Sequence, residues 1–298
     1  MRGVWTAIIT PFTQSGELDL NALKKILRDQ ADAGISGVIP CGTTGEAPTL
    51  TNDEKKLMIQ TCVQELKGSP VRVVAGTGSN VTRDTVEFSQ WASSAGVDGV
   101  LVVTPYYNKP SQFGMEEHFK AVASDINCEV IVYNVPGRTG VSLTANTVAR
   151  LAKHPKIRTI KEATGNPTLS SEILYQAAQQ GVQIDVLSGD DATYLPLLSI
   201  GAVGVISVAS NLFPRAMVEL QKSFDTGDLK KALEIHQRYY PLFRDLFIES
   251  NPVPIKAAMA ALGWCSSQVR LPLSDLQPTS LNQLARSMEE CKIVRSRS

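Results

Sequence analysis

The sequence predicts a (β/α)8 TIM barrel of the α/β class with a C-terminal helical subdomain, and three observations support this fold class. Short apolar runs rich in Val and Ile alternate with longer segments of helical period, which indicates repeated βα units with a parallel sheet. Eight such runs precede residue 225, and eight nearly equal units favour a closed barrel over an open sheet. Gly34, Gly96 and Gly201 each stand two or three residues before a run, as glycines that end helices do.

The individual elements follow from this pattern in chain order. Strands are expected at residues 4–9, 37–40, 71–75, 99–103, 129–133, 157–161, 184–187 and 203–207. Helices, most of them opening on Asn or Thr as good N-caps, are expected at 21–33, 52–66, 82–94 and 144–153. Further helical periods lie at 228–247, 254–262 and 279–290. The predicted domains are therefore a catalytic barrel, 1–224, and a helical subdomain, 225–298.

Composition excludes several classes of function. Lys+Arg and Asp+Glu both number 29, so the chain carries no excess of basic residues with which to bind nucleic acid. No segment has the roughly 18 to 20 apolar residues of a membrane span, and no leader pattern follows Met1. We therefore expect a cytoplasmic protein that binds small molecules and neither nucleic acid nor membrane.

A metal centre is also not expected. The five cysteines include no C-x-x-C pair, and the three histidines have no metal-binding spacing. Asp190 and Asp191 are interpreted as helix caps rather than ligands. We predict no metal and no cofactor.

Lys161 is the most informative residue, because it follows the β-branched run 157–160 and precedes Glu162. Strand ends facing loops carry the chemistry of a parallel barrel. A lysine held there among apolar neighbours can lose its proton and attack a carbonyl to form a Schiff base. The alternative is a solvated lysine at a sheet edge, which is the commoner situation for a lone lysine.

Other predicted strand ends carry residues suited to a small carboxylate substrate. The glycines and hydroxyls of residues 42–46 can form an anion cradle, or an ordinary turn. Arg138, on a glycine-flanked loop, can clamp a carboxylate through two hydrogen bonds, or form an exposed salt bridge. Tyr107 and Tyr133 can carry protons, or simply pack.

Five segments together resemble the dihydrodipicolinate synthase (4-hydroxy-tetrahydrodipicolinate synthase) family of the N-acetylneuraminate lyase superfamily. These segments are GTTGE at 42–46, TPYYN at 104–108, YNVPGRTG at 133–140, KEATG at 161–165 and SGDD at 188–191. The resemblance covers essentially the whole chain. It implies a class I aldolase-type lyase that condenses pyruvate with L-aspartate 4-semialdehyde through a lysine Schiff base, on the diaminopimelate route of lysine biosynthesis.

The resemblance also implies roles for individual residues. Lys161 would form the imine, and Tyr133, Thr43 and Tyr107 would relay protons. Substrate would be bound by Thr44, Arg138, Ile206 and Gly189. Tyr107 would serve the neighbouring subunit, which implies a homotetramer built as a dimer of dimers.

In some members of the family lysine inhibits at a subunit interface. The matching positions here are Ala47, Pro48, Asn52, Lys55, Asn80, Asp84 and Tyr106. Lys55 stands where sensitive enzymes typically carry His or Glu, and its cation would repel the ammonium groups of the inhibitor. We therefore predict weak or absent inhibition by lysine.

Two rival functions stay open from sequence. The nearer one is another pyruvate-dependent class I aldolase, of the sialic acid or ketodeoxygluconate lyase type, although Arg138 favours the synthase. The more distant one is a catalytically silent barrel used as a binding protein, because a fold alone does not establish function.

Overall fold

Eight short strands, connected by helices, form a closed parallel barrel in chain order, as the sequence predicts. The computed structural model describes residues 1–294, so the last four residues of the predicted subdomain 225–298 lie outside the described residues. The strands are β1 (Gly3–Thr6), β2 (Gly37–Val38), β3 (Arg72–Gly76), β4 (Gly99–Val103), β5 (Glu129–Asn134), β6 (Thr159–Glu162), β7 (Asp185–Ser188) and β8 (Gly204–Ser207).

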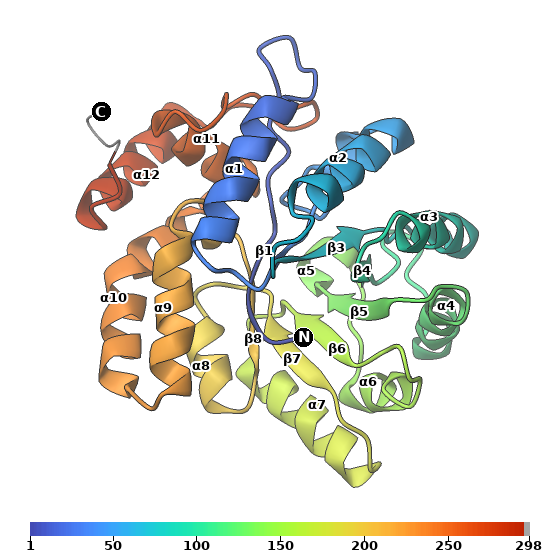
Figure 1. Ribbon diagram of the computed structural model, residues 1–298. Helices are drawn as coiled ribbons and strands as arrows, with labels where there is room; N and C mark the ends of the chain where they lie inside the picture. Colours follow the sequence, from blue (N-terminus) through green and yellow to red (C-terminus); the bar gives the residue numbers. More distant parts are fainter. Residues whose placement is uncertain (295–298) are drawn as a thin grey trace. The chain divides into compact units, whose positions relative to one another are not determined.

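Helices follow the strands and continue beyond the last one (Figure 1). Those between strands are α1 (Leu20–Asp32), α2 (Asn52–Glu65), α3 (Thr82–Ser94), α4 (Gln112–Ser124), α5 (Pro136–Thr139), α6 (Ala145–Leu151), α7 (Pro167–Gln179) and α8 (Tyr194–Ser199), with a 3₁₀ turn η1 (Ala47–Thr49). After β8 come η2 (Ala209–Asn211), α9 (Pro214–Asp225), α10 (Leu229–Asp245), α11 (Val253–Ala261) and α12 (Pro278–Glu290).

The chain groups into two compact units. One comprises Met1–Gly3 and Arg72–Ile206, and the other comprises Val4–Val71 and the chain from Ser207 onward. Both units contain strands of the barrel. The predicted boundary between residues 224 and 225 therefore stays a prediction.

The first unit contains β3 to β7, whose strands are buried on both faces. Central positions such as Val102, Val132 and Ile160 are fully buried, as expected for parallel strands covered by helices. Helices α3, α4 and α6 run along the outer side of β4, β5 and β6 (Figure 1). Helices α4, α6 and α7 each begin at a side chain that accepts a backbone N–H, for example Ser111 for α4 and Asn166 for α7.

The second unit contains the β1–β2 pair and the helices after β8. Trp5 pairs with Gly37 in parallel register. Helices α9 and α10 pack side by side (Figure 1). Helix α2 begins with a capping box in which Thr51 and Glu54 each accept the other's backbone N–H.

The predicted element boundaries are closest where the local signals are strongest. The bounds of α3 and β4 match the predicted ranges 82–94 and 99–103, and Gly34, Gly96 and Gly201 all have the expected positive φ. Strand β6 begins two residues later than predicted, because the N–H of Ile157 donates to His154 O in a preceding turn. It also continues past Lys161 to Glu162.

Candidate active site

Lys161 and Tyr133 are brought together in the first unit. They are register partners on β6 and β5, and both are buried, with 6% of each residue exposed. The Lys161 Nζ lies 4.2 Å from the centre of the Tyr133 ring, a distance at which the ring face attracts an ammonium group. Two of the residues predicted to be catalytic therefore form a buried amine–phenol pair.

The next residue on each strand belongs to a second polar group, which sequence reasoning missed. Side chains alternate along a strand, so Asn134 and Glu162 point away from the Tyr133–Lys161 side. Asn134 Nδ2 donates to Glu162 Oε1 at 3.3 Å, while its Oδ1 accepts from the N–H of Leu143 at 3.0 Å. Burial raises the pKa of Glu162, and hydrogen bonds from Thr164 and Asn134 oppose this rise. This group fixes the turn that follows Tyr133.

Arg138 lies in that turn, but on a short helix rather than on the expected loop. Helix α5 begins at Pro136, as proline favours. It ends at Gly140, whose φ of 73° is left-handed. The Arg138 side chain is exposed.

Gly189 and Ile206 lie at the ends of β7 and β8. The N–H of Gly189 donates to Glu162 O at 2.7 Å, and a Cβ at this position would lie 2.5 Å from the Cβ of Ala163. A side chain at this position would collide with Ala163, so the close approach of these two segments requires glycine. Ile206 is fully buried.

Tyr106 and Tyr107 follow β4, and their environments differ sharply from that of Tyr133. Tyr107 is 88% exposed and has a φ of 72°, an unfavourable backbone conformation for an aromatic residue. Asn108 Nδ2 donates to Asn80 O at 2.9 Å, which joins this turn to the segment before α3. Asp84, in the first turn of α3, is exposed and forms a long ion pair with Arg83. Asn80, Asp84 and Tyr106 thus belong to one turn region of the first unit.

The remaining predicted residues lie in the second unit. Thr43 is half-buried, and Thr44 is buried with 2% exposed. Ala47 is in η1, and Asn52 and Lys55 are in the first turns of α2. The Lys55 carbonyl accepts from Cys41 Sγ at 3.7 Å.

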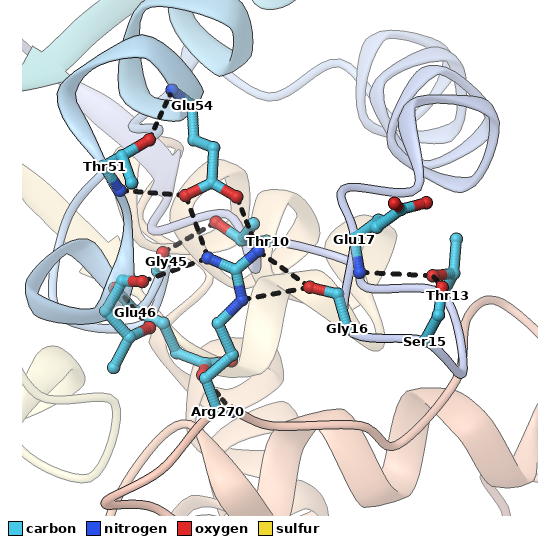
Figure 2. A network of polar contacts seen from close by, with 11 residues as sticks. Thr10, Thr13, Ser15, Gly16, Glu17, Gly45, Glu46, Thr51, Glu54 and Arg270 are labelled. Carbon is cyan, nitrogen blue, oxygen red and sulfur yellow. Dashed lines mark hydrogen bonds and ion pairs between the residues drawn. The ribbon is translucent and has the colours of Figure 1, made fainter.

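The 42–46 loop is held tightly at Gly45. Its carbonyl accepts from Thr10 Oγ1 at 2.6 Å (Figure 2). A Cβ on Gly45 would lie 3.1 Å from Cys41 N and 3.2 Å from Ile8 O, both of them backbone atoms. Glycine at this position lets the loop approach the end of the first strand closely.

Glu46 ends the loop in a left-handed conformation, with a φ of 52°. Its Oε1 accepts from Lys256 Nζ at 2.6 Å, and both side chains are fully buried. Its Oε2 accepts from the backbone N–H of Arg270 at 3.2 Å. Burial lowers the pKa of Lys256, whereas the Glu46 carboxylate opposes that shift. The paired charges therefore hold the loop end in a conformation that a non-glycine residue rarely adopts.

Arg270 uses every N–H of its guanidinium in this network (Figure 2). Nε and Nη2 donate to Gly16 O, and Nη1 donates to Thr49 O. Nη1 and Nη2 also bind the two carboxylate oxygens of Glu54 at 2.9 and 2.5 Å. The hydrogen bonds from Arg270 lower the pKa of Glu54 to about 2.

Sequence reasoning missed three residues that hold this loop: Lys256, Arg270 and Asn251. Asn251 donates to Thr44 Oγ1 at 2.9 Å. One signal was available for Lys256, because it is the single charge in the apolar helix α11. A charge at such a position is buried and must find a partner.

Within residues 1–294 there is no group of three or more His, Cys, Asp or Glu side chains that could hold a metal ion. Across the same residues, each helix is too short or too polar to cross a bilayer.

Comparison with known proteins gives consistent results. The model of the "Dihydrodipicolinate synthetase family" matches residues 1–291. A 4-hydroxy-tetrahydrodipicolinate synthase from Leptospira biflexa is 50% identical over 275 residues, which is 92% of each chain. The crystal structure of dihydrodipicolinate synthase from Aquifex aeolicus superposes with a TM-score of 0.95 at 41% identity, covering 99% of this chain and 100% of that one. A structure described as the first monomeric dihydrodipicolinate synthase variant has a TM-score of 0.95 and 38% identity, with 99% and 98% covered.

The closed barrel, the buried lysine and these relatives define a Schiff-base-forming lyase of the class I aldolase type. More narrowly, the chain belongs to the dihydrodipicolinate synthetase family.

Proposed function

We propose that this protein is a 4-hydroxy-tetrahydrodipicolinate synthase, which condenses pyruvate with L-aspartate 4-semialdehyde in the diaminopimelate route to lysine. The observation that carries the proposal is the buried Lys161–Tyr133 pair in a chain 50% identical to a synthase of that name. A primary amine beside a phenol that can exchange protons is the arrangement that imine formation needs.

In the proposed reaction, the neutral Lys161 amine attacks the ketone carbon of pyruvate, and water leaves as the imine forms. Loss of a methyl proton from the imine gives an enamine. The enamine carbon then bonds to the aldehyde carbon of the semialdehyde, whose oxygen takes up a proton. Covalent attachment divides one difficult carbon–carbon bond formation into easier steps.

Tyr133 is proposed to move protons to and from the imine, since its ring already lies against the Lys161 amine. Thr43 and Tyr107 would extend the relay, and neutral hydroxyls do so without burying another charge. In a closed barrel the carboxyl ends of all strands share one face, so Thr44, Arg138, Ile206 and Gly189, which all follow or end strands, are assigned to substrate binding.

We also propose that the protein assembles as a homotetramer, a dimer of dimers, in which Tyr107 enters the relay of the neighbouring subunit. The 88% exposure of Tyr107 supports a role outside its own chain. The barrel by itself does not require assembly, because a monomeric variant shares this fold.

Borohydride reduction in the presence of pyruvate, followed by peptide mass mapping, tests the proposal. We expect one reduced adduct, on Lys161. Lys256 is a matched internal control, because it is also buried but its ammonium is paired with Glu46. An unmodified Lys161 in folded protein would refute the Schiff-base mechanism and would favour a catalytically silent barrel.

A turnover assay then separates the synthase from other aldolases. We expect aspartate semialdehyde with pyruvate to support turnover, and sialic acid or a ketodeoxy sugar acid to give none. Cleavage of a sugar acid without activity on the semialdehyde would instead assign the lyase function.

A further inference from the structure

The contact between Asn251 and Thr44 joins the stretch just before α11 to the 42–46 loop. Asn251 Nδ2 donates to Thr44 Oγ1 at 2.9 Å, and both residues are buried. Five positions later, Lys256 Nζ donates to Glu46 Oε1. One short stretch of chain therefore holds two alternate residues of the loop.

The direction of the Asn251 bond determines what Thr44 can do. A threonine hydroxyl has one hydrogen to donate and two lone pairs with which to accept. Because Asn251 donates, it occupies a lone pair of Thr44 and leaves the hydroxyl hydrogen for another acceptor.

A hydrogen bond to a charged acceptor is stronger than one between neutral groups, and pyruvate supplies such an acceptor in its carboxylate. We propose that Asn251 is a positioning residue for the proposed synthase: by donating to Thr44 it aims the Thr44 hydroxyl hydrogen at the substrate carboxylate. This inference rests on the proposed function and deepens it, because it extends the carboxylate site to a residue far from the predicted strand ends. Lys256 and Glu46 keep the same loop in register with Asn251.

Two substitutions separate aiming from packing. Asn251→Leu keeps nearly the same shape but removes the donor, so Thr44 is no longer oriented. Asn251→Asp keeps the shape and reverses the bond, because a carboxylate only accepts. In that variant Thr44 must donate to the introduced carboxylate rather than to pyruvate.

The readout is the pyruvate concentration at which half of Lys161 is trapped by borohydride, together with KM for pyruvate and kcat. We expect Asn251→Leu to raise the half-trapping concentration severalfold and Asn251→Asp to raise it at least tenfold, with kcat changing less than KM. In a Thr44→Val background, Asn251→Leu should change the half-trapping concentration by less than twofold, because the hydroxyl that Asn251 orients is gone.

Ser287→Ala is the matched control for lost stability. Ser287 Oγ donates to Asp245 in a buried bond of the C-terminal helices that does not involve the 42–46 loop. We expect this variant to lower Tm while the pyruvate dependence of trapping stays that of the wild type.

The possible results separate a failure of the proposed function from a failure of the role proposed for Asn251. If wild-type protein gives no adduct, the proposed function fails and the role of Asn251 falls with it. If wild-type protein is trapped and both Asn251 variants show the wild-type pyruvate dependence, only the positioning role is overturned. An equal effect of Asn251→Leu in the wild-type and Thr44→Val backgrounds would likewise overturn it.

Discussion

Two lysines are buried among residues 1–294, and the groups in contact with their amines differ. Lys256 donates to the Glu46 carboxylate at 2.6 Å and lies 4.1 Å from the centre of the Phe12 ring. Lys161 lies against the Tyr133 ring and, within the described residues, has no ion-pair partner. The Lys256 amine is held by an ion pair that anchors Glu46, whereas the Lys161 amine lies beside the ring of the residue that we propose exchanges protons with its imine.

His118 predicts a pH dependence of stability. It is 3% exposed, and burial lowers its pKa from 6.5 to about 4. Between these values the unfolded chain binds a proton that the folded protein does not, so stability falls as the pH drops from about 6.5 to 4. We expect up to about 3 kcal/mol of this loss to disappear in His118→Gln. Urea unfolding at pH 7, 5.5 and 4 measures it.

The control is His154→Gln, because His154 is only half-buried. Its replacement should leave most of the pH dependence in place. If His118→Gln and wild-type protein lose the same free energy of unfolding on acidification, His118 is not the responsible group.

The prediction of weak or absent inhibition by lysine depends on Lys55. Lys55 is one of the positions that match the inhibitor site of the family, and its ammonium would repel the ammonium groups of lysine. We expect submillimolar L-lysine to leave turnover nearly unchanged. Lys55→Glu should introduce or strengthen inhibition, whereas the same charge reversal at the neighbouring Lys56 should not. Clear inhibition of wild-type protein in a steady-state assay would contradict the prediction.

At the scale of elements, ion pairs connect Glu46 at the start of η1 with helix α11, and helix α2 with the segment that follows α11. The network contains two ion pairs, Lys256 with Glu46 and Arg270 with Glu54. The Phe12 ring lies against both cations, with its centre 4.1 Å from Lys256 Nζ and 4.3 Å from Arg270 Cζ. Since buried charges are stabilising only when every one is paired, the network acts as a unit. Removing one charged side chain should therefore lower the free energy of unfolding more than removing both members of an ion pair.

The Glu46–Lys256 pair tests this expectation directly. Lys256→Met strands the buried Glu46 carboxylate and should lower the free energy of unfolding by about 3–5 kcal/mol. Adding Glu46→Gln removes the stranded charge and should restore most of that loss. Urea unfolding of both single variants and the double variant measures the coupling, and simple additivity of the two losses would show that the charges act independently.

The sequence predicted elements better than it predicted the contacts between them. Periodicity and glycine stops placed α3 and β4 to the residue, because these signals are local. The short helix α5 was expected as a loop, since four residues are too few to show a helical period. Asn251 was not predicted at all. Its partner Thr44 is 207 positions away, and no local pattern reports a contact of that separation.

For the whole molecule, barrel closure could be predicted because eight similar units repeat along the chain. Lys161 and Tyr133 could be placed together because each ends an apolar run and parallel strands share one face. The conformation of Tyr107 could not, because its φ of 72° depends on the turn around it. Its exposure leads to a prediction about assembly.

We expect the protein to sediment as a tetramer and Tyr107→Phe to leave that state unchanged. The variant lacks one hydroxyl of the proposed relay, so turnover should fall about tenfold or more. Imine formation with pyruvate should persist in part, because Tyr133 and Lys161 are intact. Sedimentation velocity, turnover and borohydride trapping measure the three quantities. Wild-type turnover in Tyr107→Phe would exclude Tyr107 from the relay.

The residues that anchor the 42–46 loop also affect the order in which contacts form while the chain is being synthesised. Asn251, Lys256 and Arg270 follow their partners by 207 to 224 positions. When the eighth strand, which ends at Ser207, has been synthesised, none of these three anchors has yet been translated. Lys161 is therefore synthesised before the residues that hold the 42–46 loop, and the loop can acquire these contacts only after the C-terminal part of the chain has been made.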